Sequence, residues 1–356
     1  MSVRSNRERS GLPTVAALTV AVLAVSSSAP LIAFAAAPAL ALAFWRNAIA
    51  AVALTPTTLV PRRAELRNAA RRDLWFCVLA GLALAAHFGT WMPSVQLGSV
   101  ATATALVATQ PIWQGLIAAW QGRRPSTAGW IGIAFAVAGA AWATGADVGV
   151  STRAVLADVL AVLGGMAAAV YTALGERART RLSTTTYTWI CYGVCAVVLL
   201  VVCLAAGLEL FRYDKQTWAA IIAIAAGAQL LGHSMFNYAL HRTSATTVSV
   251  LILLETPGAA LLAWVWLGQT PRLAALPGVA LLLAGVAVVV IGGTREARAG
   301  ATAALADGAA PTPGVAPAGA GEPGSSRGVA PAGAGEPGSS RGAAPAGADD
   351  GGSSPR

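Results

Sequence analysis

Charged residues are scarce in this chain. Asp, Glu, Lys and Arg make up only 11% of its 356 residues, whereas 56% are hydrophobic. Because a typical soluble domain carries about 25% charged residues, this composition excludes an ordinary soluble protein and indicates a polytopic membrane protein. The net charge of +9 does not indicate nucleic-acid binding, since the basic residues stand between apolar runs, as loop charges beside a membrane do.

Cysteine and histidine are also rare, with four and three residues respectively. The cysteines all lie inside apolar runs, which is typical of small buried thiols and not of a disulfide framework or a metal site. The sequence contains no HExxH motif, no Gly-x-Ser with catalytic partners and no Walker-type glycine loop. We therefore predict no enzymatic activity, no metal, no cofactor and no ATP-driven step within this chain.

What the sequence does contain is a series of apolar runs, each near the length of about 20 residues that crosses a bilayer. Ten are found, near residues 12–36, 38–60, 74–96, 98–121, 128–147, 155–175, 187–207, 217–240, 245–267 and 273–293. The first run follows three arginines and resembles a signal peptide, but it continues past the Ser-Ser-Ala at 27–29. It therefore predicts an uncleaved first helix.

The basic residues predict the orientation of these spans. If the N-terminus is cytoplasmic, sixteen arginines fall in inner segments and only four basic residues, Arg153, Arg212, Lys215 and Arg272, fall in outer loops. This is a strong positive-inside signal. It predicts a multi-pass protein of the plasma membrane with both termini in the cytoplasm.

One stretch of the chain occurs twice. Residues Gly81–Gly145 align without a gap on Gly227–Ile291 when shifted by 146 positions. His87 then matches His233, and Pro111 matches Pro257. A duplicated apolar block is the sequence trace of an internal structural repeat. Because five spans per half is an odd number, the second half is expected to cross the membrane in the opposite sense.

The fold prediction is therefore an all-α integral membrane protein with ten transmembrane helices in two inverted five-helix repeats. Residues 1–11 form a cytoplasmic N-terminus, 12–147 the first repeat and 155–293 the second. The segment GVAPAGAGEPGSSR at Gly314–Arg327 repeats at Gly328–Arg341, and this Gly, Pro, Ala and Ser composition cannot bury a core. Residues 294–356 are thus expected to be a disordered cytoplasmic tail.

Four ionisable residues lie deep inside apolar runs, where a charge costs roughly 2.5–3.5 kcal/mol. Arg46 lies about eight residues, or ~12 Å of helix, from the outer end of its run. Glu255 is near the middle of the ninth run, and His87 and His233 are equivalent positions of the repeat. We expect Arg46 and Glu255 to face a central cavity and to interact there. The alternatives are a purely structural ion pair, and histidines that only join helices.

Helical spacing places further polar and aromatic residues beside these four. Gln229, His233 and Asn237 form an i, i+4, i+8 stripe, while His87 shares a face with Trp91, and Gln110 with Gln114. Apolar walls with a few convergent polar groups are typical of a small-molecule site. The candidate binding or coupling residues are Arg46, His87, Trp91, Gln110, Tyr171, Tyr192, His233, Asn237 and Glu255. Pro111 and Pro257, at the centres of their runs, are candidate helix hinges.

Three segments together resemble the EamA-like transporters of the drug/metabolite transporter superfamily. They are AFWRN (Ala43–Asn47), HFGTWMPSVQLGSVATATALVATQPIW (His87–Trp113) and LLGHSMFNYALHRTSATTVSVLILLETPGAALLAWVWLGQTP (Leu230–Pro271). The resemblance covers about residues 12–293. The family often carries Leu-Gly-Glu at the ends of the fourth and ninth helices, but QGRRP (Gln121–Pro125) and LGQTP (Leu267–Pro271) have no Glu.

This resemblance implies a secondary transporter, most often an exporter, of a small organic metabolite such as an amino acid or a drug-like compound. It works by alternating access around a site at the membrane midplane between the repeats. Arg46 is expected to hold an anionic group, and Glu255 to hold a cationic group or a proton. The expected partners are the substrate, the lipid bilayer, a coupled proton or counter-substrate, and a second copy in a homodimer. A non-transporting membrane scaffold and a membrane-embedded enzyme remain the alternatives.

Overall fold

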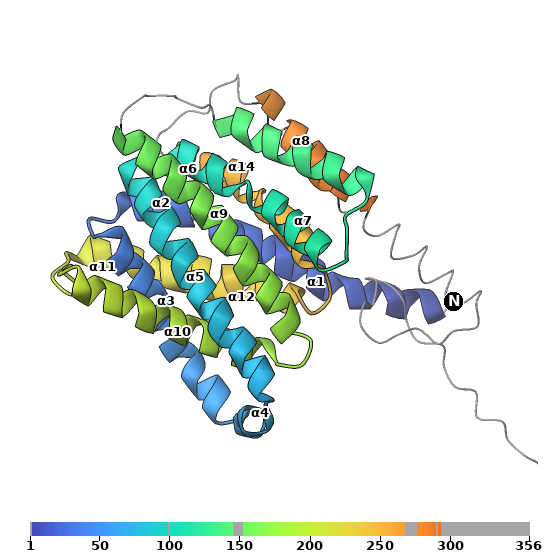
Figure 1. The fold of residues 1–356 in the computed structure, drawn as a ribbon, viewed down its shortest axis with the longest axis horizontal. Helices are drawn as coiled ribbons and strands as arrows, with labels where there is room; N and C mark the ends of the chain where they lie inside the picture. The colour runs from blue at the N-terminus through green and yellow to red at the C-terminus, as the bar shows by residue number, and fades with distance from the viewer. Residues whose placement is uncertain are drawn as a thin grey trace, which may run out of the picture. The chain divides into compact units, whose positions relative to one another are not determined.

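The computed structural model describes residues 2–98, 100–144, 152–267, 276–278, 280–289 and 291–292. Within these ranges every regular element is a helix (Figure 1). In chain order they are α1 (Ser2–Ser26), α2 (Ser28–Phe34), α3 (Ala39–Leu59), α4 (Arg63–Asn68), α5 (Arg71–Leu97), α6 (Val100–Val107), α7 (Gln110–Trp120), α8 (Thr127–Thr144), α9 (Thr152–Ala178), α10 (Thr184–Ala205), α11 (Lys215–Ile224), η1 (Ala225–His233), α12 (Ser234–Ala239), α13 (Ala245–Ile252) and α14 (Glu255–Leu267). A further apolar helix covers Leu276–Val289. The expected tail at 294–356 lies outside the described residues.

Among the described residues, seven segments are helical, long and apolar enough to cross a membrane. They are Thr14–Phe34, Ala39–Leu59, Arg71–Leu97, Val155–Ala178, Thr184–Ala205, Lys215–Ala239 and Ala245–Trp266. These match seven of the ten expected spans. The fifth and tenth are found as shorter apolar helices, Thr127–Gly139 and Leu276–Val289, and the fourth is divided between α6 and α7.

Pro111 and Pro257 interrupt the helices of their apolar runs and do not merely bend them. A proline lacks the N–H that would bond to the carbonyl four residues earlier, and its ring crowds that carbonyl. For Pro111 this carbonyl belongs to Val107, where α6 ends, and for Pro257 it belongs to Leu253, one residue after α13 ends. Both prolines consequently lie in the first turn of the following helix, α7 or α14, and not at a helix centre.

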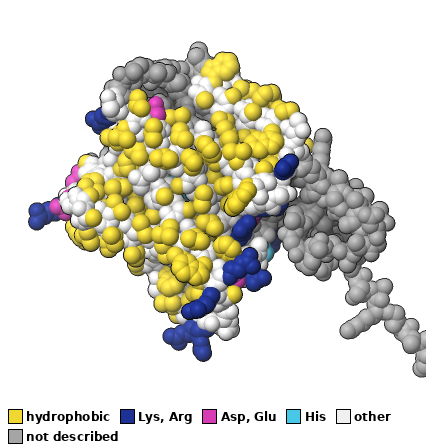
Figure 2. Space-filling view, viewed as in Figure 1, with side chains coloured by type: hydrophobic (Ala, Val, Ile, Leu, Met, Phe, Trp, Pro, Cys, Tyr) yellow, Lys and Arg dark blue, Asp and Glu magenta, His cyan; other side chains and the backbone are white. Residues whose placement is uncertain are grey.

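Helices of the two repeats pack against each other throughout the described region. Helix α5 runs along α9, and α3 lies against α10 (Figure 1). The main hydrophobic core lies among α3, α5 and α10 and includes Leu42, Leu84, Phe88 and Leu199. Many large apolar side chains are nevertheless exposed, such as Val52 and Val265 at 71% and 75%, and Figure 2 shows them over most of one face. Such a surface is suited to lipid.

Trp120 and Trp266, which the repeat makes equivalent, end α7 and nearly end α14 and are 88% and 50% exposed. Indole rings at helix ends commonly sit at the level of the lipid headgroups. Their position agrees with a role as interface anchors.

Acidic and basic side chains form pairs where helix ends meet. Arg123 after α7 donates to both carboxylate oxygens of Glu176 near the end of α9, at 3.0 and 2.7 Å. Arg181 lies 3.8 Å from Asp73 at the start of α5. Glu65 in α4 accepts from the backbone and hydroxyl of Ser183, which caps α10. We call this group the charged end; each of its three contacts joins residues of 12–147 to residues of 155–293.

Glu65 stabilises the charged end only while it is ionised. Burial raises the pKa of this carboxyl, but the donors of Ser183 and Thr186 outweigh burial and bring the pKa below its ordinary value of 4.5. Because the pKa is lower in the folded state, the stabilisation is complete above pH ~4.5 and is lost as the pH falls through the folded value.

We therefore expect Glu65→Gln to reduce the free energy of unfolding by about 1 kcal/mol at pH 7, the usual net contribution of one hydrogen bond. Thermal unfolding in detergent at a series of pH values measures this. The difference between variant and parent should shrink below pH ~4.5. A difference that stays constant down to pH 3 would mean that the Glu65 charge is not responsible.

Candidate functional site: a cavity between the repeats

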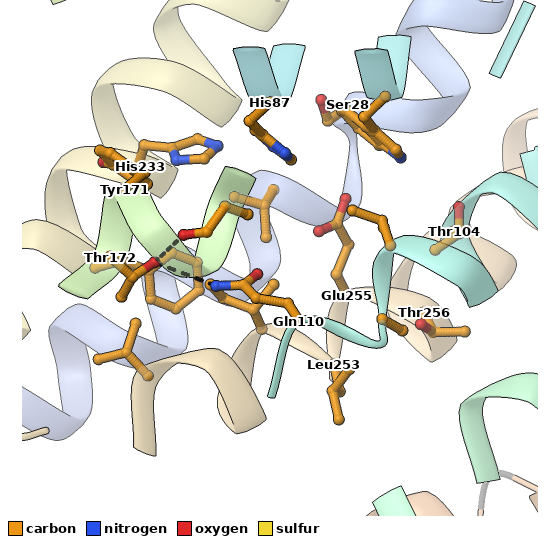
Figure 3. Close-up of a pocket in the computed structure, with 18 of the residues that line it drawn as sticks. Ser28, His87, Thr104, Gln110, Tyr171, Thr172, His233, Leu253, Glu255 and Thr256 are labelled. Carbon is orange, nitrogen blue, oxygen red and sulfur yellow. Dashed lines mark hydrogen bonds between the residues drawn. The ribbon is translucent and has the colours of Figure 1, made fainter. Parts of the chain in front are cut away.

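A cavity of about 60 Å³ lies where helices of both repeats converge. Its walls come from the α1–α2 junction, α5, the α6–α7 segment, α9, the end of η1, α12 and the α13–α14 segment (Figure 3). A water molecule occupies about 30 Å³ of liquid, so the cavity in this conformation holds only a few waters. A larger ligand requires the surrounding helices to separate.

Irregular backbone surrounds this cavity. Helix α1 ends at Ser26 and α2 begins at Ser28, residues 108–109 separate α6 from α7, and residues 253–254 separate α13 from α14. The last two breaks are equivalent positions of the repeat to within one residue. Beside them, η1 is a π-helix of nine residues, a rare form that is frequent at functional sites. Broken helices at membrane depth are tolerated only where they are buried in protein or line a water-filled space.

Seven of the nine candidate side chains line the cavity: His87, Trp91, Gln110, Tyr171, His233, Asn237 and Glu255. The hinge prolines are not among the lining residues, although each immediately follows a lining residue, Gln110 or Thr256. Arg46 and Tyr192 do not line the cavity either; both are buried behind it. Seven of the nine predicted residues thus lie around one cavity and two lie outside its lining, while a binding or coupling role for any of the nine stays a prediction.

Glu255 is the first residue of α14 and the one charged residue among those that line the cavity. Figure 3 shows its carboxylate turned toward the wall that carries His87 and Ser28. Within the described ranges no hydrogen bond or salt bridge to this carboxylate is found. The expected direct pair with Arg46 is therefore absent from this conformation, although the two charges are close enough to attract each other.

Arg46 is held in a separate polar cluster. Its Nε donates to Gln229 Oε1 at 2.7 Å, one terminal nitrogen donates to Ser28 Oγ at 3.3 Å, and Cζ lies 4.1 Å from the centre of the Phe88 ring. The other terminal nitrogen, Nη2, is buried without a hydrogen-bond partner. Ser28 also lines the cavity, so it stands between Arg46 and the space beside Glu255.

The expected stripe on the eighth span is divided by the π-helix. Its wider turn changes which side chains share a face, and Gln229 bonds to Arg46 and to Asn47 on α3. His233 and Asn237 instead line the cavity, where Asn237 donates to the Tyr171 hydroxyl at 2.6 Å. Gln229 therefore holds Arg46 in position and is not among the residues that line the cavity.

His87 and Trp91 form one wall of the cavity with parallel rings, their centroids 5.7 Å apart. His87 Nδ1 lies 2.9 Å from the carbonyl of Gly164. Because a carbonyl only accepts, Nδ1 carries the hydrogen, and Nε2 of the neutral ring keeps its lone pair. The indole nitrogen of Trp91 is buried and has no partner in the structure.

Several small polar lining residues were not anticipated from the sequence. Ser28, Thr104, Thr172 and Thr256 all contribute to the walls. A hydroxyl in an apolar run gives a weak signal, because it can bond to the carbonyl of the preceding turn, as Thr172 does with Ala168. Thr172 is connected to a predicted site residue only in the structure, where the amide nitrogen of Gln110 donates to its hydroxyl at 3.2 Å.

Comparison with known proteins supports the repeat. The profile of the EamA-like transporter family matches residues 12–145 and again 155–291. A solved crystal structure, described only as that of a protein, is similar to this chain with a TM-score of 0.65 and 19% identity. The similarity covers 81% of this chain and 99% of the other, and it shows a shared fold. No curated protein matched the chain.

Proposed function

Because the chain belongs to the EamA-like transporter family, and so to the drug/metabolite transporter superfamily, we propose that it is a secondary exporter of a small organic metabolite. The single observation that carries this is the cavity, which both repeats line and which contains the carboxyl of Glu255, without a hydrogen-bond or salt-bridge partner among the described residues. The chain is a multi-pass membrane protein. A packed scaffold would gain nothing from such a carboxylate, because an intramembrane charge is costly.

We propose that the two repeats are inverted with respect to the membrane. Reciprocal contacts between α8 and Leu276–Val289 support this: Gly132 packs on Gly285, and Gly139 packs on Gly278. The repeat equates Gly132 with Gly278 and Gly139 with Gly285, so each contact maps onto the other, as a two-fold axis requires. The later glycine of α8 contacts the earlier glycine of Leu276–Val289, so the two helices are antiparallel. They lie side by side in Figure 1. A two-fold axis that relates antiparallel neighbours is perpendicular to them, in the membrane plane.

The charged end is proposed to be the cytoplasmic gate, in its closed state. The positive-inside pattern puts Arg62, Arg123 and Arg181 in the cytoplasm, and Figure 2 shows several Lys and Arg side chains gathered at the lower edge of the molecule. Ion pairs between the repeats hold this end together. Alternating access would separate these pairs, with the α6–α7 and α13–α14 breaks acting as hinges and Glu255 carrying the substrate or a proton.

An untargeted comparison of culture media tests the function. Cells that express the full chain are compared with cells that carry an empty vector at equal density. We expect at least one small metabolite to accumulate outside only when the chain is expressed. Identical media, together with no uptake into inside-out vesicles of any metabolite from the cell extract, would contradict the proposal.

A matched tyrosine pair tests the position of the site. Tyr171→Phe removes the hydroxyl that accepts from Asn237 in the cavity wall, and a lost hydrogen bond of about 1 kcal/mol corresponds to roughly a fivefold loss of transport. Tyr192 is equally buried but does not line the cavity, and its hydroxyl bonds are longer, at 3.1 and 3.4 Å. Transport should therefore fall in Tyr171→Phe and not in Tyr192→Phe, at matched membrane abundance. The reverse order would place the site elsewhere.

A further inference from the structure

We propose that the substrate is a small organic cation, a protonated amine without a carboxylate, and this inference rests on the proposed transport function. The sequence, with Arg46 and Glu255 both deep inside apolar runs, suggested a zwitterion such as an amino acid, which would suit both charges. The structure separates the two charges: Glu255 lines the cavity, and Arg46 does not. Among the described residues that line the cavity, Glu255 is therefore the one carboxyl, and a bound cation would stabilise its ionised form.

Arg46 is not free to bind an anionic group in this arrangement. Two of its nitrogens already donate, to Gln229 and to Ser28, and its guanidinium lies over the ring of Phe88. Ser28 stands between it and the cavity. A substrate carboxylate would have to displace Ser28 before it could reach Nη2.

The hydrogen-bonding groups of the cavity favour a donor ligand. An ammonium group offers three N–H donors and no acceptor. Acceptors in the cavity walls include the Glu255 carboxyl, the Nε2 of His87, whose other nitrogen donates to Gly164, and the Oε1 of Gln110, whose amide nitrogen donates to Thr172.

Donors for an anion are present in the walls, but among the described lining residues they are neutral groups, such as the indole nitrogen of Trp91 and the hydroxyl of Tyr171. A carboxylate would therefore meet no positive charge there. It would also approach Glu255 and be repelled.

Aromatic rings complete the environment for a cation. Trp91, Tyr171 and Phe236 line the same cavity as Glu255. The negative face of an aromatic ring attracts a cation with about 0.5–2 kcal/mol, and more strongly where water is excluded. A carboxylate among aromatic rings is an arrangement that recognises organic ammonium groups. The small volume restricts the first candidates to short amines.

Three compounds that share one carbon chain test this proposal. Butylamine is a cation, norvaline adds a carboxylate and is a zwitterion, and pentanoate lacks the amine and is an anion. Each is titrated into the purified full-length protein in detergent, and the shift of its thermal unfolding temperature is measured, since a ligand that binds the folded state raises it. Binding in detergent avoids the passive leakage of amines through lipid.

We expect butylamine to bind about tenfold more tightly than norvaline, with pentanoate weakest. Glu255→Gln should abolish the preference for butylamine, and Glu209→Gln, the same change on an exposed turn, should retain it. Norvaline binding as tightly as butylamine, or no shift with any of the three, overturns the proposal. Neither result affects the transport function, which the media comparison tests independently.

Discussion

Replacement of Glu255 by Gln is expected to abolish transport while the protein still folds and inserts. Removing one partner of a buried charge pair costs about 2–5 kcal/mol of binding, which corresponds to a loss of affinity of roughly thirtyfold or more. Folding should be little changed, because the carboxylate has no hydrogen bond or salt bridge to lose within the described residues and Gln has nearly the same shape.

The measurement is the rate of substrate export at equal membrane abundance, with thermal unfolding in detergent as the test of folding. Glu209→Gln is the matched control, because it makes the same chemical change at a residue that accepts only from backbone N–H groups of its own turn. Export is expected to persist in this control. If Glu255→Gln exported at the parental rate, the carboxylate would have no part in the mechanism.

Substitution of Gly285 by Ala is expected to destabilise the protein markedly. A Cβ at Gly285 would lie 2.4 Å from the backbone nitrogen of Ala136 and 2.6 Å from the carbonyl oxygen of Gly132. These are main-chain atoms of α8, so no side chain can rotate away and the two helices must separate. Overpacking of this kind costs typically about 1–3 kcal/mol.

Gly193 offers the matched control. It lies in the interior of α10, and a Cβ there would meet no atom within 4 Å. Gly193→Ala should therefore raise stability by up to about 1 kcal/mol, the difference in helix propensity. Thermal unfolding of both variants in detergent should show opposite shifts. A Gly285→Ala variant as stable as Gly193→Ala would show that α8 and Leu276–Val289 do not pack through their glycines.

Local chemistry made several features of this protein predictable. The apolar runs determined where the helices lie, because backbone groups in lipid must bond within a helix. The two prolines marked the interruptions of the fourth and ninth runs, since each deprives one carbonyl of its partner. The repeat identified His87 and His233 together, and both line the cavity.

The division of roles between Arg46 and Glu255 was not predictable in the same way. Both residues are expensive in a membrane, so the sequence indicated that both matter and suggested that they pair. Which of them faces the cavity depends on Ser28 and Gln229, which are 18 and 183 positions from Arg46 along the chain. No pattern along the sequence reports such long-range hydrogen bonds.

The π-helix is the second feature that the sequence did not reveal. Residues 225–233 have the apolar spacing of an ordinary span, and the α-helical stripe through Gln229, His233 and Asn237 was a reasonable prediction from it. Whether the turns of this helix widen to hold an extra residue depends on the side chains packed against it. Here these are Arg46 and Asn47, which bond to Gln229. The result is that one member of the stripe supports Arg46 while the other two line the cavity.

Composition, repeat period and proline chemistry are local properties, so the sequence alone predicts a duplicated membrane protein with costly polar residues inside its apolar runs. The packing of the helices determines that Glu255 lines the cavity, that Arg46 lies behind Ser28, and that ion pairs between the repeats join one end. These depend on contacts between residues far apart in the chain, and such contacts form only when the helices pack.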